Sequence, residues 1–179
     1  MATHVALLRG INVGGHNKIA MADLRAMVTG LGFADVSTYI QSGNVLFSAA
    51  GTDDEGIAKA IAAGLSATFG LDVGVVVVSR DRLAAVISAN PYPAEDNPKC
   101  LHVVFLATEP SPERLSQLAA LQAAKGGRDT VTAAGRALYL HTPDGFGTSE
   151  LAKALTRLPS SGTARNWATT TKLLQLCDG

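Results

Sequence analysis

The chain has 179 residues, of which 47% are hydrophobic, 17% charged and 5% aromatic. This length and composition are sufficient to bury a hydrophobic core, which excludes an intrinsically disordered protein. Fifteen basic and fifteen acidic residues give a formal net charge of +0, so we expect no broad positive face for duplex DNA.

Cysteine and histidine positions indicate neither a metal site nor a disulfide. Cys100 and Cys177 form no Cys-x-x-Cys motif, and the four histidines include no pair at metal-ligand spacing. The chain starts without a basic, signal-like segment, and its aliphatic runs, such as residues 75–78, are far shorter than the ~20 residues that span a bilayer. We therefore expect a cytoplasmic protein with no metal, no cofactor and no membrane segment.

The first half of the chain predicts the element order β-α-β-β-α-β. Apolar residues repeat at helical spacing in two segments, and a polar, glycine-containing link at residues 41–44 predicts a hairpin. The expected strands are residues 4–8, 36–40, 45–47 and 73–78, and the expected helices are 21–31 and 57–69. This is the order of a ferredoxin-like unit.

The second half repeats the pattern after a proline-containing linker. Residues 102–106 match residues 4–8 at three of five positions. Further strands are expected at 129–133 and 136–141, and helices at 112–125, 148–158 and 163–177. The last of these helices takes the place of the final strand of the first half. We predict an α+β protein of two duplicated ferredoxin-like subdomains, residues 1–80 and 99–179, joined by a short helix and linker at 81–98 and ending in a C-terminal helix.

The expected topology brings two polar loops together. Residues 4–8 and 36–40 should run parallel with 45–47 between them, so residues 9–18 and the hairpin 41–44 should emerge at the same end of the sheet. A single cleft shared by these loops is therefore predicted.

Residues 9–18 read Arg-Gly-Ile-Asn-Val-Gly-Gly-His-Asn-Lys. Glycines between a strand and a helix can turn several backbone N–H groups toward an anion, which Arg9 and Lys18 would also attract. The segment lacks the Lys-Ser/Thr of a Walker loop and contains no Gly-x-Gly-x-x-Gly, which disfavours Walker-type nucleotide hydrolysis. The alternative is a turn in which the glycines only satisfy positive φ, and residues 41–44 are likewise ordinary turn residues.

Several distinctive motifs are spread along the chain. They are residues 7–17, Tyr39-Ile40-Gln41-Ser42-Gly43-Asn44, Asn90-Pro91, Gly145-Phe146-Gly147-Thr148-Ser149, and Arg165-Asn166-Trp167 followed by Lys172-Leu173. Together they resemble the bacterial family called domain of unknown function 1697. The resemblance implies a duplication of two ferredoxin-like subdomains and supplies no biochemical function. Two positions depart from the family pattern: Glu150 stands where a lysine is usual, which removes one candidate anion ligand, and Ala164 stands where a threonine is usual.

These observations favour binding of a small anionic or phosphorylated metabolite or nucleotide. The expected ligand-binding residues are Arg9, Asn12, Gly14, Gly15, Lys18, Gln41, Asn44 and Arg165. No residue can be assigned a catalytic role. One alternative is a module that binds single-stranded nucleic acid, since ferredoxin-like sheets can stack bases on aromatic residues. Another is that the motifs are purely structural in a protein-interaction module.

Overall fold

The computed structural model describes residues 1–51, 53–158 and 162–179. Its contacts divide the chain into two compact units, one formed by Met1–Ala85 with Lys172–Gly179 and the other by Val86–Thr171. The division falls within two helices, α3 (Arg80–Ser88) and α6 (Trp167–Asp178).

The first unit contains a four-stranded antiparallel sheet in the order β2-β3-β1-β4. Strands β1 and β2 are therefore parallel, with β3 between them, as the sequence predicted. The elements of this sheet and its two helices are β1 (His4–Leu8), α1 (Met21–Gly30), β2 (Ala34–Tyr39), β3 (Asn44–Ser48), α2 (Asp54–Phe69) and β4 (Val75–Ser79).

The second unit repeats this arrangement with the strand order β6-β7-β5-β8. Its elements are β5 (Leu101–Phe105), α4 (Pro112–Lys125), β6 (Thr130–Ala134), β7 (Ala137–His141), α5 (Glu150–Thr156) and β8 (Thr163–Asn166). The predicted α+β duplication of two ferredoxin-like subdomains with a C-terminal helix is confirmed.

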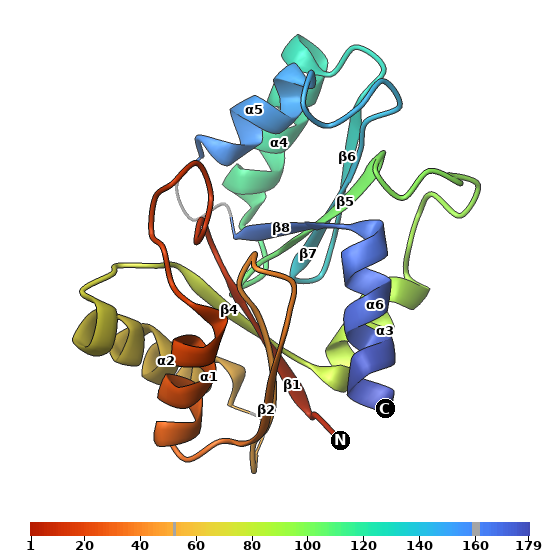
Figure 1. The fold of residues 1–179 in the computed structure, drawn as a ribbon. Coiled ribbons are helices and arrows are strands. Elements are labelled where there is room, and N and C mark those ends of the chain that lie inside the picture. The colour runs from red at the N-terminus through yellow and green to blue at the C-terminus, as the bar shows by residue number, and fades with distance from the viewer. Residues whose placement is uncertain (52, 159–161) are drawn as a thin grey trace. The chain divides into compact units, whose positions relative to one another are not determined.

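Helices α1 and α2 cover one face of the first sheet (Figure 1). Leu24 and Val28 of α1 and Ile61 and Leu65 of α2 are fully buried in the core beneath them. Gly64 permits the close approach of the two helices, since a Cβ there would lie 2.7 Å from Met27 Sδ. A chain poor in aromatic residues thus fills its core with aliphatic side chains and short interhelical distances.

Helices α4 and α5 pack on one face of the second sheet (Figure 1). Leu118 and Leu151 from these helices contact a core that includes Val104 and Leu140. The hydroxyl of Ser149 caps α5 by accepting a hydrogen bond from Ala152 N–H at 2.9 Å, which satisfies a backbone donor of the first turn.

The predicted C-terminal helix 163–177 is wrong at its start. Residues Thr163–Asn166 form strand β8, which pairs antiparallel with β5, and the helix begins only at Trp167. Asn166 ends the strand and caps the helix, since its Oδ1 accepts a hydrogen bond from Thr169 N–H at 2.8 Å. Nothing close to residues 163–166 in the sequence indicates that they form a strand, because their pairing partner β5 lies about 60 residues earlier in the chain.

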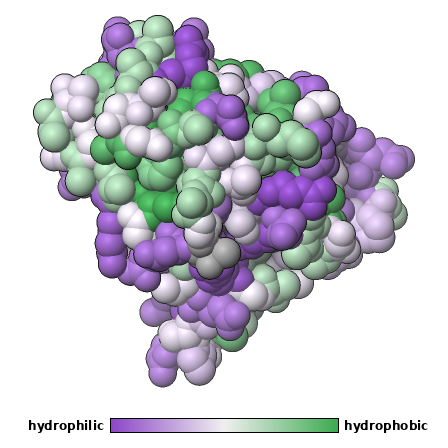
Figure 2. Space-filling model, turned by 90° about the horizontal axis from the view of Figure 1, so that it is seen from below, coloured by the Kyte–Doolittle hydropathy of each residue, from purple (hydrophilic) through white to green (hydrophobic). Residues whose placement is uncertain are grey.

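Few large hydrophobic side chains remain exposed. On the face shown in Figure 2, strongly hydrophobic residues form small separate areas among hydrophilic ones. Within the described residues, no helix combines the length and hydrophobicity needed to cross a bilayer. The exposed large hydrophobics are Met1, Val13, Leu31, Ile40, Leu115 and Leu176.

Candidate functional site

The loop after β1 folds into a small hairpin. Val13 and His16 form an antiparallel bridge, and His16 N–H donates a hydrogen bond to Val13 O at 3.0 Å. Between them, Gly14 and Gly15 have φ of +58° and +80°, as a two-residue type I′ turn requires. Turn geometry therefore explains these glycines. Their N–H groups donate no hydrogen bond within the described part of the chain.

Asn12 connects this loop to the β2–β3 hairpin. Its Nδ2 donates hydrogen bonds to Ile19 O and to Gln41 O, both at 3.0 Å, and its Oδ1 accepts one from Ile19 N–H at 2.9 Å. These contacts confirm that residues 9–18 and 41–44 meet at one end of the first sheet. We refer to residues 9–18 and 40–44 as the joined loops.

The base of the β2–β3 hairpin is held from inside the protein. The Asn44 side chain is fully buried, and its Nδ2 donates hydrogen bonds to Tyr39 O at 3.1 Å and to Ser42 Oγ at 3.0 Å. Gly43 O accepts a hydrogen bond from Leu8 N–H at 2.8 Å. Asn44, like Asn12, therefore has an observed role in holding the loops.

The outer surface of the joined loops is positively charged. Arg9, His16, Lys18 and Gln41 are exposed, and the joined loops contain no acidic residue. The Lys18 side chain lies beside the hairpin turn, with its Cε 4.0 Å from the position that a Cβ would take at Gly15.

Unusual backbone geometry also concentrates in the joined loops. They contain Asn12, Asn17 and Ile40, three of the four non-glycine residues with positive φ in the described chain. Among these residues, Ile40 at φ +49° has the least favourable backbone conformation, because its side chain branches at Cβ. Strained backbone persists where surrounding contacts hold it, and it is frequent at functional sites. Here Asn12 supplies such contacts.

Arg165, the remaining predicted ligand residue, belongs to the second unit. It lies on β8 opposite Val103, and its Nη1 donates hydrogen bonds to Thr163 Oγ1 at 2.8 Å and to Ala164 O at 2.9 Å. The side chain is almost completely buried, and burial lowers its pKa to about 10. These contacts support a structural role for Arg165. The other seven predicted residues all lie in the joined loops.

A hollow of about 590 Å³ in the second unit gathers residues that the sequence analysis did not assign to a site. In the sequence, Gly145, Phe146, Gly147 and Asn166 stand out only as members of the motifs that resemble one family, with no ligand predicted for them. That shared membership is the sequence signal that could have indicated a common site for these four residues. The lining residues are Asn97, Lys99, Cys100, His102, Pro143, Asp144, Gly145, Phe146, Gly147 and Asn166.

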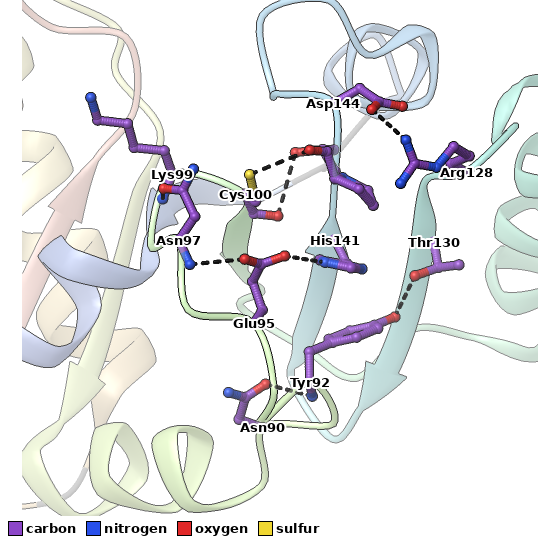
Figure 3. A network of polar contacts seen from close by, with 12 residues as sticks. Asn90, Tyr92, Glu95, Asn97, Lys99, Cys100, Arg128, Thr130, His141 and Asp144 are labelled. Carbon is purple, nitrogen blue, oxygen red and sulfur yellow. Dashed lines mark hydrogen bonds and ion pairs between the residues drawn. The ribbon is translucent and has the colours of Figure 1, made fainter.

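The segment before β5, predicted as part of a linker, is fastened to the second sheet (Figure 3). The Tyr92 hydroxyl is hydrogen bonded to Thr130 Oγ1 at 2.8 Å, and the Tyr92 ring stacks on His141 at 4.8 Å. Glu95 Oε2 lies 2.7 Å from His141 Nε2. Hydrogen bonds from His141 and from the backbone of Asn97 lower the pKa of Glu95.

A family model described as "Protein of unknown function (DUF1697)" matches residues 1–139. No curated protein matches the chain. Among solved structures, the chain is similar to the one titled "The structure of conserved bacterial protein SP0830 from Streptococcus pneumoniae", with 23% identity, a TM-score of 0.76 and 98% of each chain covered. At this identity the similarity shows a shared fold.

Proposed function

This chain belongs to the DUF1697 family, whose description assigns no function, and we propose from its own residues that the joined loops bind a small anion. One observation carries this proposal. Asn12 fixes two loops into a single surface without acidic residues, on which Lys18 lies beside Gly15 and the N–H groups of Gly14 and Gly15 donate no hydrogen bond within the described residues.

The proposed ligand is a phosphate group or a phosphorylated metabolite. Successive backbone N–H groups bind phosphate oxygens well because they are fixed dipoles that require no rearrangement on binding. Lys18 lies beside Gly15 and supplies a positive charge, while Arg9 supplies a second charge in the same loop. The Gln41 side chain is an additional hydrogen-bonding group for the ligand.

Asn12 and Asn44 have a supporting role in this proposal. Their side chains already bond to the protein backbone, so they contribute by holding the loops before the ligand arrives. A preformed loop binds more tightly because less conformational entropy is lost on binding.

The structure does not favour binding of single-stranded nucleic acid on the first sheet. Such binding needs exposed aromatic rings on which bases can stack. Phe47 of β3 is fully buried, and its ring contacts Phe33 and His4. Tyr39 is therefore the one aromatic residue of β2 and β3 with an exposed portion.

A thermal-shift assay tests the anion proposal. The probes are inorganic phosphate, pyrophosphate and a set of sugar phosphates and nucleotides. A ligand present at ~100 times its Kd adds ~2.7 kcal/mol of stability. For a chain of this size that is a rise of roughly 5–10 °C in the unfolding midpoint.

The variants Lys18→Ala and Arg9→Ala should reduce or abolish the shift. Lys172→Ala, which removes an exposed lysine of α6, should retain it and serves as the matched control. The proposal is contradicted if no probe shifts the wild-type midpoint, or if the shift is the same in Lys18→Ala and in Lys172→Ala.

A further inference from the structure

We propose that the hollow in the second unit is a separate binding site for a small organic carboxylate. The proposal concerns other residues than the joined loops and does not depend on them. It rests on the hydrogen-bonding groups that line the hollow, on the contacts that hold the segment carrying Asn97 and Lys99, and on a pair of stacked rings in the lining.

The hollow offers hydrogen-bond donors, because the carboxamides of Asn97 and Asn166 each use the oxygen in a bond to the backbone and leave the NH₂ group available. Asn97 Oδ1 accepts a hydrogen bond from Lys99 N–H at 3.1 Å, and Asn166 Oδ1 accepts one from Thr169 N–H at 2.8 Å. The NH₂ groups of both side chains donate no hydrogen bond within the described residues. A ligand that fills this hollow should therefore be rich in acceptor oxygens.

A charged side chain and backbone N–H groups also favour a ligand with acceptor oxygens. Lys99 is an exposed residue of the lining. In the described chain, the N–H groups of Phe146 and Gly147 donate no hydrogen bond. Asp144 is the one acidic lining residue, and its carboxylate is paired with Arg128 at 2.6 Å. The lining thus carries one cation, Lys99, and one carboxylate, Asp144, which is already paired with Arg128. Lys99 is therefore the lining residue that can supply a positive charge to an anion.

The wall that carries Asn97 and Lys99 is held by the contacts in Figure 3. Glu95 Oε2 bonds to His141 of β7 at 2.7 Å, and Glu95 Oε1 accepts a hydrogen bond from Asn97 N–H at 2.8 Å. Asn97 O in turn accepts one from Cys100 N–H at 2.9 Å. The donors are therefore placed by a connected series of bonds, as a preorganised site requires.

An aromatic pair also lines the hollow. The rings of His102 and Phe146 stack with centroids 4.0 Å apart and planes at 24°, and Pro143 is a further lining residue. Burial lowers the pKa of His102 to about 4, so this ring is uncharged at neutral pH. An uncharged ring pair suits the hydrocarbon part of an organic acid better than it suits inorganic phosphate.

The size of the hollow agrees with this assignment. Sites for small molecules are typically ~300–1,000 Å³ and combine an apolar lining with a few polar groups. The hollow, at about 590 Å³, accommodates a monocarboxylic acid with a ring or a short alkyl chain.

Isothermal titration calorimetry tests the proposal on the full chain. The probes are acetate, butyrate, benzoate and phenylacetate, with benzamide as an uncharged analogue of benzoate and inorganic phosphate as an anion without an apolar part. We expect benzoate or phenylacetate to bind at least tenfold more tightly than acetate, benzamide and phosphate.

Lys99→Gln should weaken carboxylate binding about tenfold or more, since a hydrogen bond to a charged group is lost. The matched control is Lys125→Gln, which removes a lysine outside the hollow and should leave the affinity unchanged. Arg128→Gln should weaken binding too, because it leaves Asp144 without its ion pair at the rim. Lys18→Ala should have no effect, which separates this site from the joined loops.

Three results would overturn the proposal. The first is that none of the four carboxylates binds at millimolar concentration. The second is that benzamide or inorganic phosphate binds as tightly as benzoate. The third is that Lys99→Gln binds carboxylates as the wild type and Lys125→Gln do.

Discussion

Replacing Asn12 by glycine tests whether its side chain holds the joined loops. The substitution keeps the backbone unstrained, because glycine adopts the observed φ of +53° freely. It removes three hydrogen bonds, to Ile19 O, to Gln41 O and from Ile19 N–H. The effect on stability therefore reports the loss of these contacts with little contribution from backbone strain.

The expected loss follows from the number of bonds. Each typical hydrogen bond contributes a net ~0.5–1.5 kcal/mol, so three contribute roughly 1.5–4.5 kcal/mol. Because the bond to Gln41 O is at an exposed position, we expect a decrease of about 2–3 kcal/mol in the free energy of unfolding. This corresponds to a fall of roughly 4–12 °C in the thermal midpoint.

Urea denaturation followed by circular dichroism measures this loss. The matched control is Asn17→Gly, since Asn17 lies in the same loop at φ +49° and its side chain donates one exposed hydrogen bond, to Gly10 O at 3.2 Å. We expect the control to lose at most about 1 kcal/mol. Equal stability of Asn12→Gly and Asn17→Gly would refute the role assigned to Asn12.

Three further predictions concern other positions. Gly43→Ala should destabilise the protein by about 2–4 kcal/mol in urea denaturation, because its Cβ would lie 2.8 Å from Leu8 Cβ and its φ is +80°. Arg165→Ala should cost about 2 kcal/mol or more without changing phosphate binding, since its bonds run to Thr163 and Ala164; unchanged stability with weakened binding would contradict this. Because the pKa of His102 falls from 6.5 to about 4 on folding, the unfolded chain binds more protons between these values, and stability should decrease as pH falls from 6.5 toward 4. His102→Gln should flatten that part of the stability profile measured by urea denaturation, and an unaltered profile would contradict the assignment.

Local patterns predicted most of the fold because most elements have a local signal. Strand β1 was predicted with its observed bounds, since an apolar run closed by Arg9-Gly10 needs no distant partner to be recognised. The meeting of residues 9–18 with 41–44 followed from strand direction alone. Strand β8 was missed because its pairing with β5 is a long-range contact.

The candidate sites were predicted less completely than the fold. The glycines and cations of the joined loops were predicted from the motif at residues 9–18. The type I′ turn at Gly14 and Gly15 and the burial of Asn44 depend on three-dimensional contacts and were not predicted. The hollow of the second unit combines segments around Lys99, Phe146 and Asn166. No local spacing connects these segments, so only the fold could bring them together.

The claim that the joined loops bind an anion is tested most directly by an NMR titration. Inorganic pyrophosphate is added to ¹⁵N-labelled protein, and the backbone amide signals are followed in the wild type and in Lys18→Ala. We predict that the signals of Gly14 and Gly15 move saturably in the wild type and remain in place in Lys18→Ala. Signals of Gly14 and Gly15 that stay unchanged in the wild type at millimolar pyrophosphate would contradict the claim.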